Sequence, residues 1–346
     1  MNVRRLIPTA AVAGAVTLGL VTLSACGGAS DASGKSADGK LSVVASFYPM
    51  QYLAEQIGGD HVAVSTLTAP GVEPHDLELK PRQIGELGEA DYILYLKGIQ
   101  PAVDEAIKQA GVKNTVDAAT LTTMEDHGTA VGHDHGAEDP GHGEAGHDHK
   151  ADEHGADEHG HEGTEGHGHE SEAGLDPHIW LDPVKYAEVA KGVGASLEKA
   201  DPDNAADYKK NTDTLVKKLG DLDTAFKDGL KNTSTKTFIT THSAFGYLAE
   251  RYGLDQEGIT GIDPESEPSP ARMKELQEIA AKEKVSTVFF ETLASDKTAK
   301  TLAKDTGLKT AVLDPLEGIT DRSQGDDYIE VMQSNLAALK KALGAK

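Results

Sequence analysis

Apolar positions along the chain switch repeatedly between two spacings, and the order of the spacings predicts strands and helices in turn. Residues 41–47 form a short apolar run typical of a strand, and apolar side chains at 50–57 recur at helical spacing. Apolar and polar positions alternate again at 62–67, which completes a β-α-β order. The order continues with a helix over 83–90, a buried strand over 92–96 and a helix over 102–110.

The second half of the chain repeats this alternation after a long helical region. One apolar stripe runs over 186–197, and the spacing over 202–231 predicts a single helix of roughly 28 residues, about 42 Å long. The further elements are strands over 237–241, 285–290 and 309–313, and helices over 245–252 and 296–306 and from Ser269-Pro270 onward. We therefore expect an α/β protein in which two (β/α) lobes with parallel-type sheets flank one long helix.

Composition and charge narrow the range of functions. The chain of 346 residues is long enough for two domains of ordinary size, each with its own core. Its net charge is −24, and residues 126–172 alone hold fourteen acidic residues and one base, Lys150. Because nucleic-acid binding depends on Lys and Arg that neutralise phosphates, this charge argues against nucleic acid and suits capture of a cation.

The N-terminus, residues 1–25, predicts an export signal rather than part of the fold. The apolar run over 6–23 leads into Ser24-Ala25-Cys26, which resembles the lipidation site of bacterial lipoproteins. We expect a lipidated Cys26, a flexible tether over 26–40 and an extracytoplasmic protein anchored to the outer face of the cytoplasmic membrane. A retained membrane anchor is the alternative, but Pro8 interrupts a run that is short for a spanning helix of about 20 residues.

Four histidines lie outside the acidic segment, and three of them occupy positions suited to binding a ligand. His75 follows the strand that ends near Thr68, and His242 ends the strand TFITTH, so both lie at carboxyl ends of strands, where ligands bind in such sheets. His178 lies in the loop LDPHIWLDP before a helix. His61 starts a strand at the opposite end of the sheet, so we interpret it as an exposed or structural residue. The other three are candidate metal ligands.

A closed zinc site takes four ligands, and imidazole nitrogen with one carboxylate oxygen is a common set. The last predicted strand ends in LDPLEG and offers Asp314 and Glu317. We favour Glu317 because it lies farther out in the loop, and Asp314 is the runner-up as fourth ligand or as the partner of a histidine ring. Glu291 is a weaker candidate. Capping of the following turn or helix is the alternative for all three acids.

Five motifs in this order and spacing resemble those of a known family: GVEPHDLEL, DPHIWLDP, THSAFGYLAERYGL, IDPESEPSP and LDPLEG. They are similar to the zinc-binding lipoproteins of bacterial ABC importers, which belong to the metal-specific cluster of solute-binding proteins. Some relatives in this cluster were named adhesins or laminin-binding lipoproteins. The resemblance covers residues 41–346 apart from the acidic segment.

This resemblance implies two lobes joined by a rigid backbone helix and one metal in the cleft between them, bound by three histidines and a carboxylate. The implied ligands are His75, His178, His242 and, from relatives with a PLE turn, Glu317. Other zinc-binding relatives use water or another acid as fourth ligand, and manganese-binding relatives replace the third histidine with an acid. Because this chain retains His242, the three-nitrogen set favours zinc. The implied division is an N-terminal lobe over 41–201, a linker helix over 202–231 and a C-terminal lobe over 232–346.

The acidic segment 126–172, called here the His-rich tract, contains eleven of the fifteen histidines. Its composition cannot bury a core, so we expect a surface loop that is disordered without metal. The predicted weak, auxiliary zinc ligands are His133, His135, His142, His147, His149, His154, His159, His161, His167 and His169. Each such site should be weak because ordering a flexible segment costs roughly 1–2 kcal/mol per residue.

The sequence therefore predicts a monomeric extracytoplasmic lipoprotein that captures Zn(II) and delivers it to the membrane subunit of an ABC permease. An enzyme is the rival class, but a zinc hydrolase would carry H-E-x-x-H on a helix, and the nearest string, HEGTE, lacks the second histidine. A surface adhesin, a zinc-buffering lipoprotein, or manganese as the transported ion are the alternatives. Since histidines must be neutral to bind metal, affinity should fall as the pH drops through about 6.5.

Overall fold

The computed structural model describes residues 39–127 and 175–346. The predicted signal peptide, the lipidated Cys26 and nearly all of the tether lie outside the described residues, as does the His-rich tract apart from Asp126 and His127. Among the helices of the two described ranges, none combines the length and the apolar character that crossing a bilayer requires.

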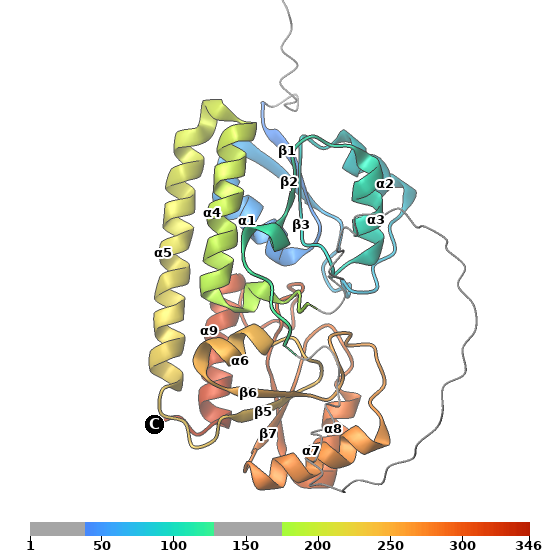
Figure 1. Ribbon diagram of the computed structural model, residues 1–346, viewed down its shortest axis with the longest axis vertical. Helices are drawn as coiled ribbons and strands as arrows, with labels where there is room; N and C mark the ends of the chain where they lie inside the picture. Colours follow the sequence, from blue (N-terminus) through green and yellow to red (C-terminus); the bar gives the residue numbers. More distant parts are fainter. Residues whose placement is uncertain (1–38, 128–174) are drawn as a thin grey trace, which may run out of the picture. The chain divides into compact units, whose positions relative to one another are not determined.

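Four parallel strands form the first sheet, in the order β2-β1-β3-β4. Their bounds are β1 (Leu41–Ala45), β2 (Val62–Thr66), β3 (Tyr92–Tyr95) and β4 (Thr115–Asp117). Helix α1 (Tyr48–Gly58) packs on one face, and α2 (Pro81–Glu89) and α3 (Pro101–Ala110) cover the other (Figure 1). The apolar runs β1 and β3 occupy the centre because both of their faces are covered.

The second sheet repeats this topology, in the order β6-β5-β7-β8, again with every strand parallel. Its strands are β5 (Thr237–Thr240), β6 (Asp255–Gly258), β7 (Thr287–Phe290) and β8 (Lys309–Val312). Its helices are α6 (Gly246–Tyr252), α7 (Pro270–Lys282), α8 (Lys297–Thr306) and α9 (Tyr328–Ala342). The side chains of α7 and α8 form a separate apolar cluster with β5 and β7 on the outer face of this sheet. The predicted α/β class with two parallel sheets is confirmed.

Two long helices connect the sheets in sequence and run side by side (Figure 1). Helix α4 (Pro183–Ala200) is capped at its N-terminus by Asp182, whose side chain accepts a hydrogen bond from the Val184 N–H. Helix α5 (Ala205–Leu230) is the predicted long helix, but it starts three residues later than predicted because residues 202–204 form a separate 3-10 turn. Helix α5 also contacts α1 and α9, so it packs against elements that belong to both sheets.

The largest apolar core takes side chains from both halves of the chain. Val43 of β1, Leu219 of α5, Phe238 of β5 and Leu339 of α9 belong to the same buried cluster. Smaller clusters cover the outer face of each sheet. One shared core therefore joins the two sheets, which limits how freely they can move apart.

Candidate metal centre

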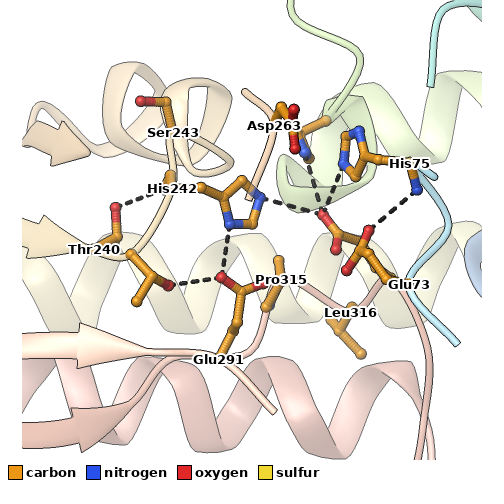
Figure 2. Close-up of polar contacts among 12 residues, drawn as sticks. Glu73, His75, Thr240, His242, Ser243, Asp263, Glu291, Pro315 and Leu316 are labelled. Atoms are coloured by element: carbon orange, nitrogen blue, oxygen red, sulfur yellow. Dashed lines mark hydrogen bonds and ion pairs between the residues drawn. The ribbon is translucent and has the colours of Figure 1, made fainter. Parts of the chain in front are cut away.

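Four side chains from distant parts of the chain converge on one point. His75, His178, His242 and Glu317 each offer one ligand atom, and these atoms lie within 4.8 Å of one another. The Nε2 atoms of His178 and His242 each lie 3.3 Å from Glu317 Oε1, and that of His75 lies 3.4 Å from it. In Figure 2, dashed lines from the labelled rings of His75 and His242 meet at one carboxylate oxygen.

These separations match those of ligands around a zinc ion. Ligand atoms 2.0–2.1 Å from the centre of a tetrahedron lie about 3.3–3.4 Å apart. The Nε2 atoms of His178 and His242 and the Oε2 atom of Glu317 are also buried without any hydrogen-bond partner. Because a buried polar group without a partner is costly, such a group in a native protein requires an explanation. A cation between these atoms would satisfy them.

The topology of the second sheet places two of these side chains. Strand β6, which follows β5 in the sequence, pairs with one edge of β5, and β7 pairs with the other edge. The direction in which strands are added to the sheet therefore reverses between β5 and β7. His242 follows β5 and Glu291 follows β7, at the carboxyl ends where doubly wound sheets bind ligands. Glu317 follows the next strand, β8, and His75 follows β2 of the first sheet. The candidate centre therefore draws on both sheets.

Trp180 ties the segment of His178 to the turn that carries Glu317. Its side chain is fully buried, and its indole N–H donates to the Pro315 carbonyl oxygen at 2.7 Å. The Tyr328 hydroxyl of α9 donates to the Trp180 carbonyl oxygen at 2.6 Å. These bonds hold the two segments in register, because a buried polar group that loses its partner costs the full desolvation penalty.

Two buried carboxylates orient the histidine rings from behind. Asp176 Oδ1 lies 2.7 Å from His178 Nδ1, and Glu291 Oε1 lies 2.8 Å from His242 Nδ1. A carboxylate that accepts the Nδ1 proton leaves Nε2 free for a metal, which is the usual arrangement behind metal-bound histidine. The sequence predicted no role for Asp176, and it offered Glu291 as a weaker candidate ligand or as a cap. In the structure, both carboxylates contact the Nδ1 atoms of the histidine rings.

The electrostatics of the centre follow from burial and close pairing. Burial disfavours charged imidazole, but the hydrogen bond to Asp176 and the nearby charge of Glu317 outweigh it and raise the pKa of His178. Burial likewise opposes charge on His242, yet Glu291 and Glu317 raise its pKa well above 6.5. Burial would raise the pKa of Glu317, but the close approach of His178 and His242 holds it well below 4.5. Without metal, the centre therefore favours the protonated forms of His178 and His242.

Glu73 is a further acid that the sequence did not single out. Its Oε1 accepts the backbone N–H of His75 at 3.1 Å, as Figure 2 shows. Burial and the nearby charge of Glu317 raise the pKa of Glu73 to about 9. Asp176 accepts the backbone N–H of His178 at 3.0 Å in the same way. Both acids belong to the string acid-Pro-His, EPH and DPH, a signal in the sequence that could have identified them.

Asp314 lies outside the group of four and holds the turn before Glu317. Its Oδ1 accepts the Leu316 N–H at 2.8 Å, and its Oδ2 accepts from the Thr292 hydroxyl at 3.0 Å. Leu316 has φ of 60°, a backbone conformation that residues other than glycine rarely adopt. The hydrogen bonds of Asp314 stabilise the turn in this conformation. In the structure, Asp314 therefore supports the backbone of the turn that carries Glu317.

His61 lies away from the centre, as its position in the sequence suggested. It ends a 3-10 turn at Gly59–His61, and its Nε2 lies 2.9 Å from Asp207 Oδ2 of α5. Its side chain is 31% exposed. Of the tract histidines, the structure describes His127 alone, and the ten predicted auxiliary ligands from His133 to His169 lie outside the described residues.

Comparison with known proteins gives a consistent picture. A family model described as "Zinc-uptake complex component A periplasmic" matches residues 43–342. The chain is 36% identical over 310 residues to the zinc-binding lipoprotein AdcA of Streptococcus pneumoniae, covering 89% of this chain. It is 36% identical over 327 residues to the high-affinity zinc uptake system protein ZnuA of Bacillus subtilis, covering 94% of each chain.

The fold resembles a solved structure of a zinc-bound relative. The Zn(II)-bound ZnuA-like domain of Streptococcus pneumoniae AdcA superposes with a TM-score of 0.67 at 32% identity, covering 88% of this chain and 99% of that domain. The chain spans 56% of the length of the whole AdcA relative. The similarity to AdcA therefore concerns one domain of that protein.

Proposed function

This chain belongs to the family of zinc-uptake complex component A, and we propose that it captures one Zn(II) ion and delivers it to an ABC permease. His75, His178, His242 and Glu317 are the proposed ligands. The observation that carries this proposal is the approach of three Nε2 atoms to one carboxylate oxygen at 3.3–3.4 Å. The names of the relatives, zinc-binding lipoprotein and zinc uptake protein, agree with this ion.

The ligand set favours zinc over manganese. Three imidazole nitrogens and one carboxylate form a borderline-soft, four-coordinate set, whereas manganese prefers sites rich in oxygen ligands. Four protein ligands also leave no coordination position for a reactive water, so the proposed role is binding and release rather than catalysis. His75, whose side chain is 10% exposed, is the only proposed ligand that reaches the surface, so it marks the proposed route of entry.

The proposed setting follows from the N-terminal sequence and the family. The proposed lipid on Cys26 would hold the protein at the outer face of the membrane, and the tether would let it reach the permease. An adhesin role finds little support, because the described surface exposes only three scattered large apolar residues, Val72, Ile84 and Leu175. The His-rich tract would bind additional zinc weakly.

Zinc should stabilise the folded protein strongly. At free zinc about 1,000-fold above the dissociation constant, binding contributes about 4 kcal/mol, which corresponds to a rise of roughly 10 °C in the unfolding midpoint. Scanning calorimetry with zinc, with magnesium and with a chelator measures this. Magnesium is the control, because it prefers octahedral oxygen ligands. An equal response to both ions, or no response to zinc, would contradict the proposed site.

Deleting residues 128–172 should separate the weak sites from the tight one. The deletion keeps all four proposed ligands and leaves the two described ranges intact. We expect fewer zinc ions bound at saturation and one tight site with unchanged affinity, measured by metal analysis and chelator competition. Loss of the tight site on deletion would show that the primary ligands lie in the tract.

A further inference from the structure

A second group of potential ligands lies at the point where the described chain meets the His-rich tract. Glu125, His127 and Glu250 each offer an atom within 4.8 Å of the others. The Nε2 atom of His127 lies 2.6 Å from Glu250 Oε2 and 3.6 Å from Glu125 Oε2. These residues come from the end of the first described range and from helix α6. None of them belongs to the group of four around Glu317.

The two groups share one buried carboxylate. Asp176 directs Oδ1 to His178 Nδ1 at 2.7 Å and Oδ2 to His127 Nδ1 at 3.2 Å, and it is 1% exposed. Both rings are therefore held by Nδ1, with Nε2 pointing away toward other carboxylate oxygens. This is the arrangement of a metal-binding histidine with its supporting acid. Asp176 supports two histidine rings in this way, those of His178 and His127.

The charges around His127 leave a negative excess. Glu125, Asp176 and Glu250 surround the ring, and among the described lysines and arginines only Lys185 is bonded to one of them, with its Nζ 2.6 Å from Glu125 Oε1. Lys185 thus engages one oxygen of Glu125 and leaves the other, Oε2, toward His127. A divalent cation would balance the remaining charge, since three carboxylates oppose one ammonium group.

The start of helix α6 is shaped to admit this histidine. A Cβ atom at Gly246 would lie 2.4 Å from the His127 Cβ and 2.8 Å from Asp176 Oδ2. Any other residue at this position would displace the ring or the carboxylate, because real Cβ contacts are never so close. The His127 ring also lies edge-on to Tyr247, with the ring centroids 4.2 Å apart. The position of His127 is therefore specified by packing as well as by charge.

We propose that Glu125, His127 and Glu250 form a second zinc site, which is linked to the tight site through Asp176. The choice of zinc rests on the proposed function of the chain. Three ligands leave at least one open position, and Glu250 is 63% exposed, so this site binds more weakly and exchanges faster than the closed site. The Glu250 side chain is free to move outward by the roughly 0.7 Å that a shared zinc ion requires.

The location suggests what the second site does. Asp176 donates its backbone N–H to the Glu125 carbonyl oxygen at 2.9 Å, so the described segments before and after the His-rich tract are joined at this site. A zinc ion bound here would be held by a ring whose supporting carboxylate also supports His178. Asp176 serves both rings, so occupancy of one site changes the hydrogen bonding available to the other.

Anomalous diffraction at the zinc edge, on crystals of the full-length protein grown with excess zinc, tests the proposal. We expect one peak among His75, His178, His242 and Glu317 and a second among Glu125, His127 and Glu250. A peak at the first position without one at the second overturns the second site and leaves the proposed function standing. Absence of the first peak counts against the proposed function itself.

Variants in solution provide an independent test. His127→Gln should bind one zinc fewer at saturation by metal analysis, with the tight site still occupied. The matched control is His61→Gln, since His61 also pairs with one surface carboxylate, Asp207, and should bind as many ions as the parent. An unchanged count in His127→Gln overturns the proposal. Asp176→Asn should weaken both sites, by about 10–100-fold at the tight one; loss at one site alone overturns the linkage.

Discussion

Replacing His178 by alanine should lower the affinity of the tight site for zinc by more than about 100-fold. Loss of a residue that only orients a metal ligand already costs about 10–100-fold, so removal of the ligand itself should cost more. His178 is fully buried and directs its Nε2 to Glu317 at 3.3 Å, so no other described side chain can take its place without rearrangement. Competition with a chromophoric chelator measures the change.

The control for this variant is His61→Ala, which removes a histidine hydrogen-bonded to Asp207 and distant from the centre, and should leave zinc affinity unchanged. Alanine at 178 also removes the ring that contacts Trp180, with centroids 5.1 Å apart, so the fold must be checked by circular dichroism. Glu317→Gln is a second, isosteric variant with less effect on packing. If both variants fold and bind zinc as tightly as the parent, the ligand assignment is wrong.

The fold was predictable where the apolar pattern is strong. Strands β1, β3, β5 and β7 carry nearly continuous apolar residues, and their order with helices between them leads directly to parallel sheets. Strand β6 was missed because Asp255, Gln256 and Glu257 are polar and lie at the edge of the sheet, where only one neighbour demands complementary residues. Strand β4 has three residues, too few to show a period.

Helix α9 was missed for a different reason. Its buried residues Tyr328, Val331, Met332, Leu336 and Leu339 have the same helical spacing that revealed the other helices. The signal is therefore present in the sequence, but no helix was predicted after residue 313. The shared core could not be predicted, because apolar spacing shows which face is buried but not which other element covers it.

The sequence could predict those ligands of the candidate centre whose positions follow from the order of the strands. Parallel strands bring their carboxyl ends to one edge, which singles out His242 and the residues after β8. The choice between Asp314 and Glu317 depends on the turn at Leu316, whose positive φ directs one acid inward and leaves the other to hold the backbone. The contact of His127 with Glu250 joins residues 123 positions apart, and no local sequence pattern predicts it.

Zinc affinity should fall on acidification from well above pH 6.5, the midpoint expected for an unperturbed histidine. Paired carboxylates raise the pKa of His178, and raise that of His242 well above 6.5, so zinc must displace protons that these rings hold more tightly than a free imidazole does. Where both rings are protonated, two protons leave for each zinc bound, so the dissociation constant should change by about 100-fold per pH unit. Chelator competition from pH 5.5 to 8.5 measures this slope.

The stability of the metal-free protein should respond to pH in the opposite sense. A histidine with a raised pKa contributes stability that is fully present below its unfolded value of about 6.5 and is lost as the pH rises through the folded value. Glu317, with a lowered pKa, contributes stability that is present above about 4.5 and is lost as the pH falls through its folded value. The metal-free centre therefore favours folding most between these limits, near pH 5.5, where zinc binds poorly. The rise in unfolding midpoint caused by zinc should be small at pH 5.5 and large at pH 8; an equal rise at both would show that the centre does not release protons to bind its ion.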